Sequence, residues 1–427
     1  MRFQFATTDR IIFGEGTARE APTLAAEFGR HALVVTGRSR ERSAFLIDLL
    51  KERQVRVTPY IVVGEPTTDR IADGLRVARE AQCDQVIGIG GGSVIDAAKI
   101  ISALMTNDGE LMEYLEVIGE GRPLAHRAAP YIAMPTTAGT GAEVTRNAVV
   151  GSPEHRVKVS MRNELMLPRV ALVDPELTYD LPQDITAASG LDALTQLMEV
   201  FVSDNSSPMT DAVCREGMSR ARNLRTAWEG SNRAILQRSF KAGLEGRPPC
   251  RPVLDRDQDR TGRSPSLHEE DDEGASFRRA RADMCLAALC SGLALANARL
   301  GAVHGLAGPL GGMYPAPHGA VCARLLPFVM EANLNALRER DPENRSVERY
   351  DEIARILTGR PDAVAQDGMD WVQALCDTLS VQGLGAYGVQ AGDFHDIISK
   401  SRNSSSMKGN PVTLTDEEVI DVLQRAL

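Results

Sequence analysis

The pattern of hydrophobic and polar positions divides the chain into two parts. Up to about Leu181, short apolar runs alternate with stretches of helical spacing. The apolar runs lie at 31–36, 56–63, 85–90, 131–134 and 170–173, and helical spacing is clear at 72–81 and 94–105. Strands that alternate with helices are typical of a parallel sheet with crossover helices. Residues 1–182 are therefore predicted to form an α/β domain with a Rossmann-like parallel sheet.

From about Asp184 onward, the runs typical of strands cease. Helical spacing replaces them at 185–202, 281–298, 321–340 and 370–379. Pro182 and Asp184 suit the boundary, with Asp184 as a candidate N-cap of the first helix. Residues 183–427 are therefore predicted to form an all-α C-terminal domain.

One charged segment, from about Gly230 to Arg279, fits neither part. Its apolar periodicity is nearly absent. Such a composition buries too little apolar surface to offset the entropy lost on ordering. An irregular, disordered insert is the leading interpretation. A partner-binding insert and an error of sequence or reading frame are the alternatives.

The composition of the 427 residues is that of a globular, cytoplasmic protein, with 43 % hydrophobic and 25 % charged residues and a formal net charge of -10. An acidic chain without a basic cluster argues against a nucleic-acid partner. No apolar run reaches the roughly 18 residues of a membrane span, and no signal-peptide layout opens the chain. The seven scattered cysteines, without a CxxC pair, argue against a zinc site built on cysteines.

A glycine-rich turn follows the apolar run at 85–90. Gly90, Gly91, Gly92 and Ser93 connect this predicted strand to a predicted helix. Glycines let backbone amides approach an anion closely, and a helix N-terminus supplies partial positive charge. The turn therefore suits a pyrophosphate, although a tight strand-to-helix turn without a ligand has the same pattern.

A second loop of small residues follows the next predicted strand, at 135–145. It places Thr136, Thr137, Thr140 and Thr145 among glycines. Hydroxyl groups here suit either a ligand or a cap on the next element. Two such loops at successive strand ends define one crevice, where ligands of open α/β sheets bind.

A carboxylate and two histidines form a candidate metal site in the helical part. Asp192 and Gln196 lie one helical turn apart and share a face. His304 and His318 are close in sequence, amid apolar and glycine residues. An acid with two imidazoles is a sensible ligand set for a catalytic divalent metal with an open position. Buried histidines with structural partners are the alternative.

Together these motifs resemble the signatures of the iron-containing (group III) alcohol dehydrogenase family. The resemblance is carried by residues 90–99, 135–145, 174–177, 304–318 and 405–411, and it spans nearly the whole chain outside the charged segment. It implies a dehydroquinate synthase-like fold with the active site between the two domains. It also implies a homo-oligomeric oxidoreductase that transfers hydride between NAD(P) and a small alcohol or aldehyde.

Carried over position by position, the resemblance assigns two sites. Asp192, His304 and His318 are implied to be catalytic metal ligands for Fe or Zn, with Gln196 at a fourth ligand position. The site for NAD or NADP is implied to contain Gly37, Arg38, Gly90, Gly91, Gly92, Ser93, Asp96, Thr136, Thr137, Thr140, Thr145, Lys158 and Leu177.

Three positions depart from the family pattern. Gln196 replaces a histidine ligand, which predicts weaker metal binding. Gly308 replaces a histidine that relays protons in some members, so a relay would need water or substrate hydroxyls. Gly37, followed by Arg38, replaces an aspartate that binds the adenine ribose, so a 2′-phosphate is no longer repelled.

These departures leave other functions open. A metal-independent reductase resembling the maleylacetate reductases is favoured by Gln196. A dehydroquinate synthase-like lyase would need a basic cluster in the cleft, and no dense one lies near the His304–His318 stretch. A chain disabled by its charged segment is a third alternative.

Overall fold

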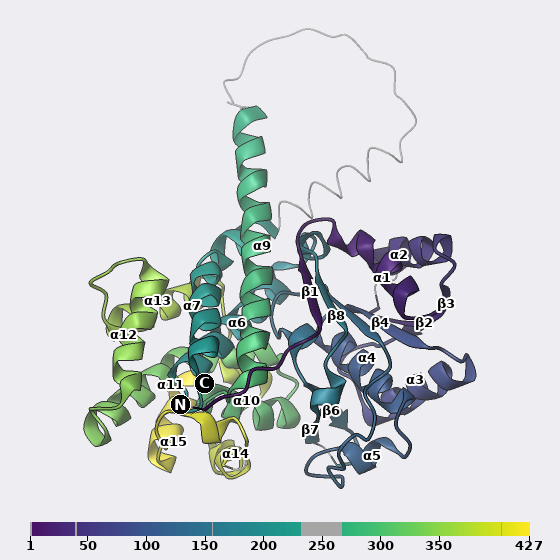
Figure 1. Ribbon diagram of the computed structural model, residues 1–427. Helices are drawn as coiled ribbons and strands as arrows, with labels where there is room; N and C mark the ends of the chain where they lie inside the picture. Colours follow the sequence, from purple (N-terminus) through teal and green to yellow (C-terminus); the bar gives the residue numbers. More distant parts are fainter. Residues whose placement is uncertain (1, 39–40, 156, 232–266, 403) are drawn as a thin grey trace, which may run out of the picture.

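The computed structural model describes residues 2–38, 41–155, 157–231, 267–402 and 404–427. A sheet with flanking helices forms one half of the molecule, and a cluster of helices forms the other (Figure 1). This arrangement confirms the predicted fold class.

The sheet of the N-terminal half has six parallel strands in the order β1-β8-β5-β4-β2-β3. The strands are β1 (Arg10–Phe13), β2 (His31–Thr36), β3 (Arg56–Ile61), β4 (Gln85–Gly90), β5 (Tyr131–Pro135) and β8 (Val170–Val173). Its helices are α1 (Ala21–Phe28), α2 (Glu41–Glu52), α3 (Thr68–Glu80), α4 (Gly92–Met105) and α5 (Leu111–Tyr114). Strands β2, β4, β5 and β8 are buried along their whole length, as expected of parallel strands covered on both faces.

Two hydrophobic cores flank this sheet. Leu33 and Val35 of β2 pack with residues of α3 and α4, whereas Ala32 and Val34 pack with residues of α1 and α2. Because successive side chains of a strand point to opposite faces, one apolar run supplies both cores. The sheet is thus fixed between two helical layers, with its carboxyl edge free to carry loops.

Three strands were not predicted. The edge strand β1 is mostly exposed, and β6 (Asn147–Ser152) and β7 (Val157–Arg162) form a separate antiparallel hairpin. The burial of β6 alternates along the strand, because only one face of the hairpin is covered. Neither case gives the continuous apolar run by which the other strands are recognised.

The C-terminal half is helical and is built around α6. Its helices are α6 (Gln183–Val202), α7 (Pro208–Ala221), α9 (Leu267–Asn297), α10 (Ala302–Met313), α11 (His318–Arg340), α12 (Arg345–Thr358), α13 (Ala365–Thr378), α14 (Phe394–Ser401) and α15 (Asp416–Ala426). Short 3-10 turns lie at Thr17–Glu20, Ala142–Val144, Glu164–Met166, Pro175–Thr178, Leu384–Tyr387, Ala391–Asp393 and Met407–Gly409. From Gly190 to Val202 every residue of α6 is buried, as expected of a helix enclosed by others.

Two helix boundaries differ from the expectation. Pro182, not Asp184, is the N-cap of α6, and Asp184 lies in the first turn without capping it. A carboxylate there still interacts favourably with the helix N-terminus. Helix α9 begins at Leu267, so 267–279 belongs to this helix and its first turns extend away from the helical half (Figure 1). The rest of the charged segment, 232–266, lies outside the described residues.

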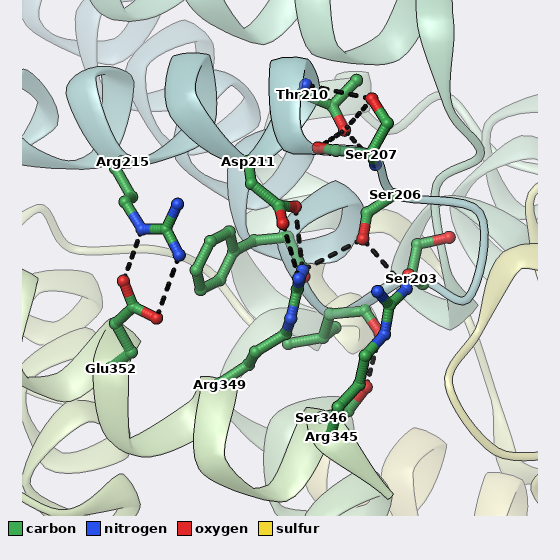
Figure 2. A network of polar contacts seen from close by, with 12 residues as sticks. Ser203, Ser206, Ser207, Thr210, Asp211, Arg215, Arg345, Ser346, Arg349 and Glu352 are labelled. Carbon is green, nitrogen blue, oxygen red and sulfur yellow. Dashed lines mark hydrogen bonds and ion pairs between the residues drawn. The ribbon is translucent and has the colours of Figure 1, made fainter. Parts of the chain in front are cut away.

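A polar network fixes the carboxyl end of α6 to α7 and α12 (Figure 2). The Arg349 guanidinium of α12 pairs with Asp211 of α7 at 2.5 Å and donates to the Phe201 carbonyl of α6. The same guanidinium lies 4.8 Å from the centre of the Phe201 ring. These contacts hold the helix that carries Asp192.

No single helix in the described part of the chain is long and apolar enough to cross a membrane. The part of α9 from Asp272 onward is long and apolar enough only when it is taken together with α10, and the two helices are bent by 96° where they meet.

Candidate active site

The glycine turn forms the amino end of α4 at the carboxyl edge of the sheet. Gly91 is the N-cap, and no side chain caps the helix. The first amides of such a helix need an acceptor from outside, and the helix dipole favours an anion. The amino end of α4 is therefore left without a side-chain cap, and the pyrophosphate site at this turn stays a prediction.

The second predicted loop lies directly beside this turn. A Cβ atom on Gly91 would lie 3.4 Å from Cγ2 of Thr137, and one on Gly92 would lie 3.1 Å from Oγ1 of Thr140. A Cβ on Gly37 would lie 3.9 Å from Val94 in the first turn of α4. The segments that follow β2, β4 and β5 thus lie close together.

The same loop packs against the helical half. The Gly139 carbonyl accepts a hydrogen bond from Ser291 of α9 at 3.2 Å. Gly141 has a φ of 60°, and a Cβ there would lie 2.4 Å from Cα of Gly292. Only glycine suits both this backbone conformation and this close approach. The loop at 135–145 therefore lies at the interface between the two halves.

Two predicted cofactor residues bond to the protein itself. Oδ2 of Asp96 accepts a hydrogen bond from the Val149 amide at 2.9 Å, and Oγ1 of Thr145 lies 2.8 Å from Nζ of Lys99. Burial raises the pKa of Asp96 to about 6 and lowers that of Lys99 to about 8. Lys99 is completely buried and also donates to the carbonyls of Ala142 and Asn147. These groups tie α4 to the loop and to β6.

The remaining predicted cofactor residues lie at different places. Arg38 is exposed at the end of β2, and Ser93 is half-buried in α4. Nζ of Lys158, on β7, pairs with Glu65 at 2.7 Å. Leu177 packs beside the core under α1 and α2 and lines a surface cavity of about 1060 Å³. Thr136 is buried and donates its amide to the Gly90 carbonyl at 2.9 Å.

The predicted metal ligands converge from three helices. Oδ1 of Asp192, on α6, lies 3.2 Å from Nε2 of His304 on α10 and 3.7 Å from Nε2 of His318 on α11. Gly319, next to His318, allows the contact, because a Cβ there would lie 2.1 Å from the Ala188 carbonyl oxygen of α6. The His318 side chain remains 41 % exposed, so the buried cluster is reached from that side.

A fourth group, Cys322 of α11, was missed by the sequence analysis. Its sulfur joins the oxygen and the two ring nitrogens in a set whose atoms all lie within 4.8 Å of one another. The prediction against cysteine ligands rested on pair spacing, and that criterion does not detect a single thiol. Its position one helical turn after His318 was the available signal.

Glu199 of α6 was also missed, although it shares a helix face with Asp192 and Gln196. Its Oε2 lies 2.6 Å from Nδ1 of His304, and its Oε1 accepts from the Val303 amide at 2.7 Å. A carboxylate at Nδ1 keeps the proton on that nitrogen and leaves the lone pair of Nε2 directed at the cluster. Glu199 therefore sets the tautomer that a ligand histidine needs.

Gln196 lies beside the cluster but makes a different contact from the histidine it replaces. Its Nε2 donates to Oδ2 of Asp192 at 3.3 Å. Its Oε1 is buried and has no hydrogen-bond partner among the described residues. A neutral amide thus orients the carboxylate, and carboxylate, imidazole and thiol groups remain as a donor set that fits a divalent transition metal.

The charges of these groups are strongly coupled. Burial alone would raise the pKa of Asp192, but the hydrogen bond and charges of the two histidines hold it below its usual value. The neighbouring Cys322 raises the pKa of His318 to about 9 against the effect of burial. Burial would raise the pKa of Cys322, yet the imidazoles lower it. These interactions therefore favour the anionic forms of Asp192 and Cys322 and the protonated forms of the two imidazoles, whose protons a cation would displace.

Both parts of the chain match a family model. Residues 8–175 match the family described as iron-containing alcohol dehydrogenase, and residues 270–427 match its C-terminal domain. Alcohol dehydrogenase 4 of Saccharomyces cerevisiae is 31 % identical over 422 residues, which are 97 % of this chain and 96 % of that protein. The 1,3-propanediol dehydrogenase of Klebsiella pneumoniae is 31 % identical over 415 residues, 93 % and 92 % of the two chains. A solved 1,3-propanediol oxidoreductase superposes with a TM-score of 0.83 at 27 % identity and full coverage of both chains.

Proposed function

The chain belongs to the iron-containing alcohol dehydrogenase family, and from this premise we propose that its reaction takes place between the glycine turn and the Asp192–His304–His318 cluster. It is an oxidoreductase that transfers hydride between NAD(P) and an alcohol or aldehyde. The turn at Gly90–Ser93 holds the pyrophosphate, and Thr137 and Thr140 line the same crevice. The substrate is a small primary alcohol or its aldehyde, which enters beside His318.

Asp192, His304 and His318 hold one divalent cation in this proposal. Such a cation, when bound, polarises the substrate oxygen, and the nicotinamide carries the hydride. The protein contributes the buried charge of Asp192 and the tautomer of His304 that Glu199 fixes. Gln196 holds the second oxygen of Asp192 and so orients the carboxylate. A Cβ on Gly308 would meet open space, which supports proton transfer through water or substrate hydroxyls.

The observation that carries the proposal is the convergence of three helices on Oδ1 of Asp192. Protein purified without chelator should contain one divalent ion per chain, and His304→Ala should lose both the ion and the reduction of NAD(P) by alcohols. The exposed His395, replaced in the same way, is the matched control. Full activity of metal-free protein would overturn the proposal and favour the metal-independent reductase to which Gln196 points.

Cofactor preference is a further part of the proposal. Gly37 lies at the end of β2 beside the glycine turn, and the exposed Arg38 follows it. With no carboxylate at position 37 to repel a 2′-phosphate, the enzyme accepts NADP(H) at least as well as NAD(H). A charge-assisted contact with the phosphate adds roughly 1.5–3 kcal/mol, reduced where the arginine is exposed to solvent.

Steady-state kinetics with both cofactors test this preference. The space at Gly37 accommodates an aspartate, because the nearest atom to a Cβ is 3.9 Å away. Gly37→Asp should shift the ratio of kcat/KM values toward NAD(H). An unchanged ratio would mean that residue 37 does not face the ribose.

A further inference from the structure

Cys322 occupies a defined place in the candidate metal site. It lies on α11 one helical turn after His318 and is completely buried. Its Sγ lies 3.7 Å from Nε2 of His304 and 3.7 Å from Nε2 of His318. Cys322 is the one cysteine that belongs to a possible ligand group in the described part of the chain.

Four of the six distances within this group are close to those of a tetrahedral site. Typical bonds to zinc of about 2.3 Å for sulfur, 2.05 Å for nitrogen and 2.0 Å for oxygen place sulfur and nitrogen about 3.6 Å apart, and oxygen and nitrogen about 3.3 Å apart. The two sulfur–nitrogen distances are both 3.7 Å, and the two oxygen–nitrogen distances are 3.2 and 3.7 Å. Each imidazole nitrogen is thus placed relative to the sulfur and to the carboxylate oxygen nearly as one shared ion requires, and all four atoms lie within 4.8 Å of one another.

The charge of the group also suits a divalent ion. The site is buried, and a buried charge is costly unless an opposite charge compensates it. Among the ligands themselves, a carboxylate and a thiolate together neutralise two positive charges, whereas without Cys322 the one charged ligand is Asp192 and Glu199 acts through His304. The neutral Gln196 adds no charge, and its amide nitrogen already bonds to Asp192.

We propose that Cys322 is a metal ligand through its thiolate, so that the protein ligands are Asp192, His304, His318 and Cys322, and the substrate oxygen binds as a fifth ligand. This inference rests on the metal site of the proposed function. The sulfur binds as the thiol proton is released to solvent. A set of one sulfur, two nitrogens and one oxygen suits Zn²⁺ or Co²⁺ better than the hard cations Mg²⁺ or Ca²⁺.

Cobalt substitution of the full-length protein tests the proposal. The wild type should show a near-ultraviolet sulfur-to-cobalt charge-transfer band together with the visible bands of tetrahedral Co²⁺. Cys322→Ser should lose the charge-transfer band, and its Zn²⁺ affinity should fall by more than the roughly 10–100-fold cost of losing an orienting group. The matched control is Cys376→Ser on α13. This cysteine is also buried, and its thiol donates to the Ala323 carbonyl, which a serine hydroxyl can also do.

A second measurement needs no variant. X-ray absorption at the zinc edge of the wild type should show one sulfur neighbour at about 2.3 Å. A shell of nitrogen and oxygen only, with one bound ion per chain, would overturn the role of Cys322 and leave the metal site intact. Absence of any bound ion would overturn both proposals.

Discussion

Replacement of Glu199 by glutamine tests how the metal site is oriented. The carboxylate accepts on both oxygens: Oε1 from the amides of Val303 and His304 at 2.7 and 3.4 Å, and Oε2 from Nδ1 of His304 at 2.6 Å. Glutamine has the same shape but only one acceptor. Its NH₂ group must face either Nδ1 or the amides of α10, and each orientation leaves one contact mismatched.

The two orientations of the amide have different costs. If NH₂ faces Nδ1, the ring proton moves to Nε2, and the lone pair that would bind the cation is lost. If NH₂ faces the helix, two donors oppose each other at the amino end of α10. Loss of one charge-assisted hydrogen bond costs about 1.5–3 kcal/mol. Loss of an orienting partner of a ligand histidine typically weakens metal binding by about 10–100-fold.

The assay is competition for Zn²⁺ with a chromogenic chelator, together with urea unfolding of the metal-free protein. Glu199→Gln should bind Zn²⁺ about 10–100-fold more weakly than the wild type. Glu216→Gln on α7, which removes an exposed pair with Arg220, is the control and should bind normally. Unchanged affinity in a folded Glu199→Gln protein would refute the idea that this carboxylate sets the tautomer of His304.

Three more substitutions, two of them with a control variant, probe the framework around the site. Gly141→Ala should cost about 1–3 kcal/mol in urea unfolding. Gly121→Ala is the control and measures the cost of the left-handed backbone alone, because Gly121 has a similar φ of 62° but open space around it. Equal losses of stability in the two variants would contradict the close contact between Gly141 and Gly292. Burial raises the pKa of Glu143 to about 7, so the stability contributed by its protonated form is full below about pH 4.5 and is lost as the pH rises through 7. Glu143→Gln should flatten that decline in stability. Parallel stability profiles of variant and wild type from pH 5 to 8 would contradict this pKa. Asp211→Asn leaves the largely buried Arg349 without its partner and should cost about 3 kcal/mol. The more exposed Arg215 pair, removed by Glu352→Gln, should cost about 0.5 kcal/mol, and a similar loss in both variants would contradict the difference in burial.

Apart from the edge strand β3, the strands that were predicted from sequence are those with a complete hydrophobic signature. Strands β2, β4 and β5 are covered on both faces and so consist of continuous apolar runs. The edge strand β1 and the hairpin β6–β7 are covered on one face at most, so their residues alternate or remain polar. The start of α9 was missed because its first turns are charged and extend from the helical half.

The residues of the candidate site were also found only in part from the sequence. Asp192, His304 and His318 stand out by residue type, because carboxylates and imidazoles amid apolar residues call for an explanation. Glu199 and Cys322 do not stand out, because glutamate is common on helices and a lone cysteine is usually a buried thiol. Spacing places each of them on the same helix face as a predicted ligand, but their roles also depend on which helix faces which, and spacing within one helix does not give that information.

The two sites are linked through α6. A Cβ on Gly139, in the loop at 135–145, would lie 2.8 Å from Cβ of Ser189, so this loop packs against α6. Asp192 follows Ser189 by three residues, about 4.5 Å along the helix axis. The loop therefore packs against one turn of α6, and the next turn of the same helix carries the Asp192 carboxylate. A shift of α6 would therefore move this loop and the Asp192 carboxylate together.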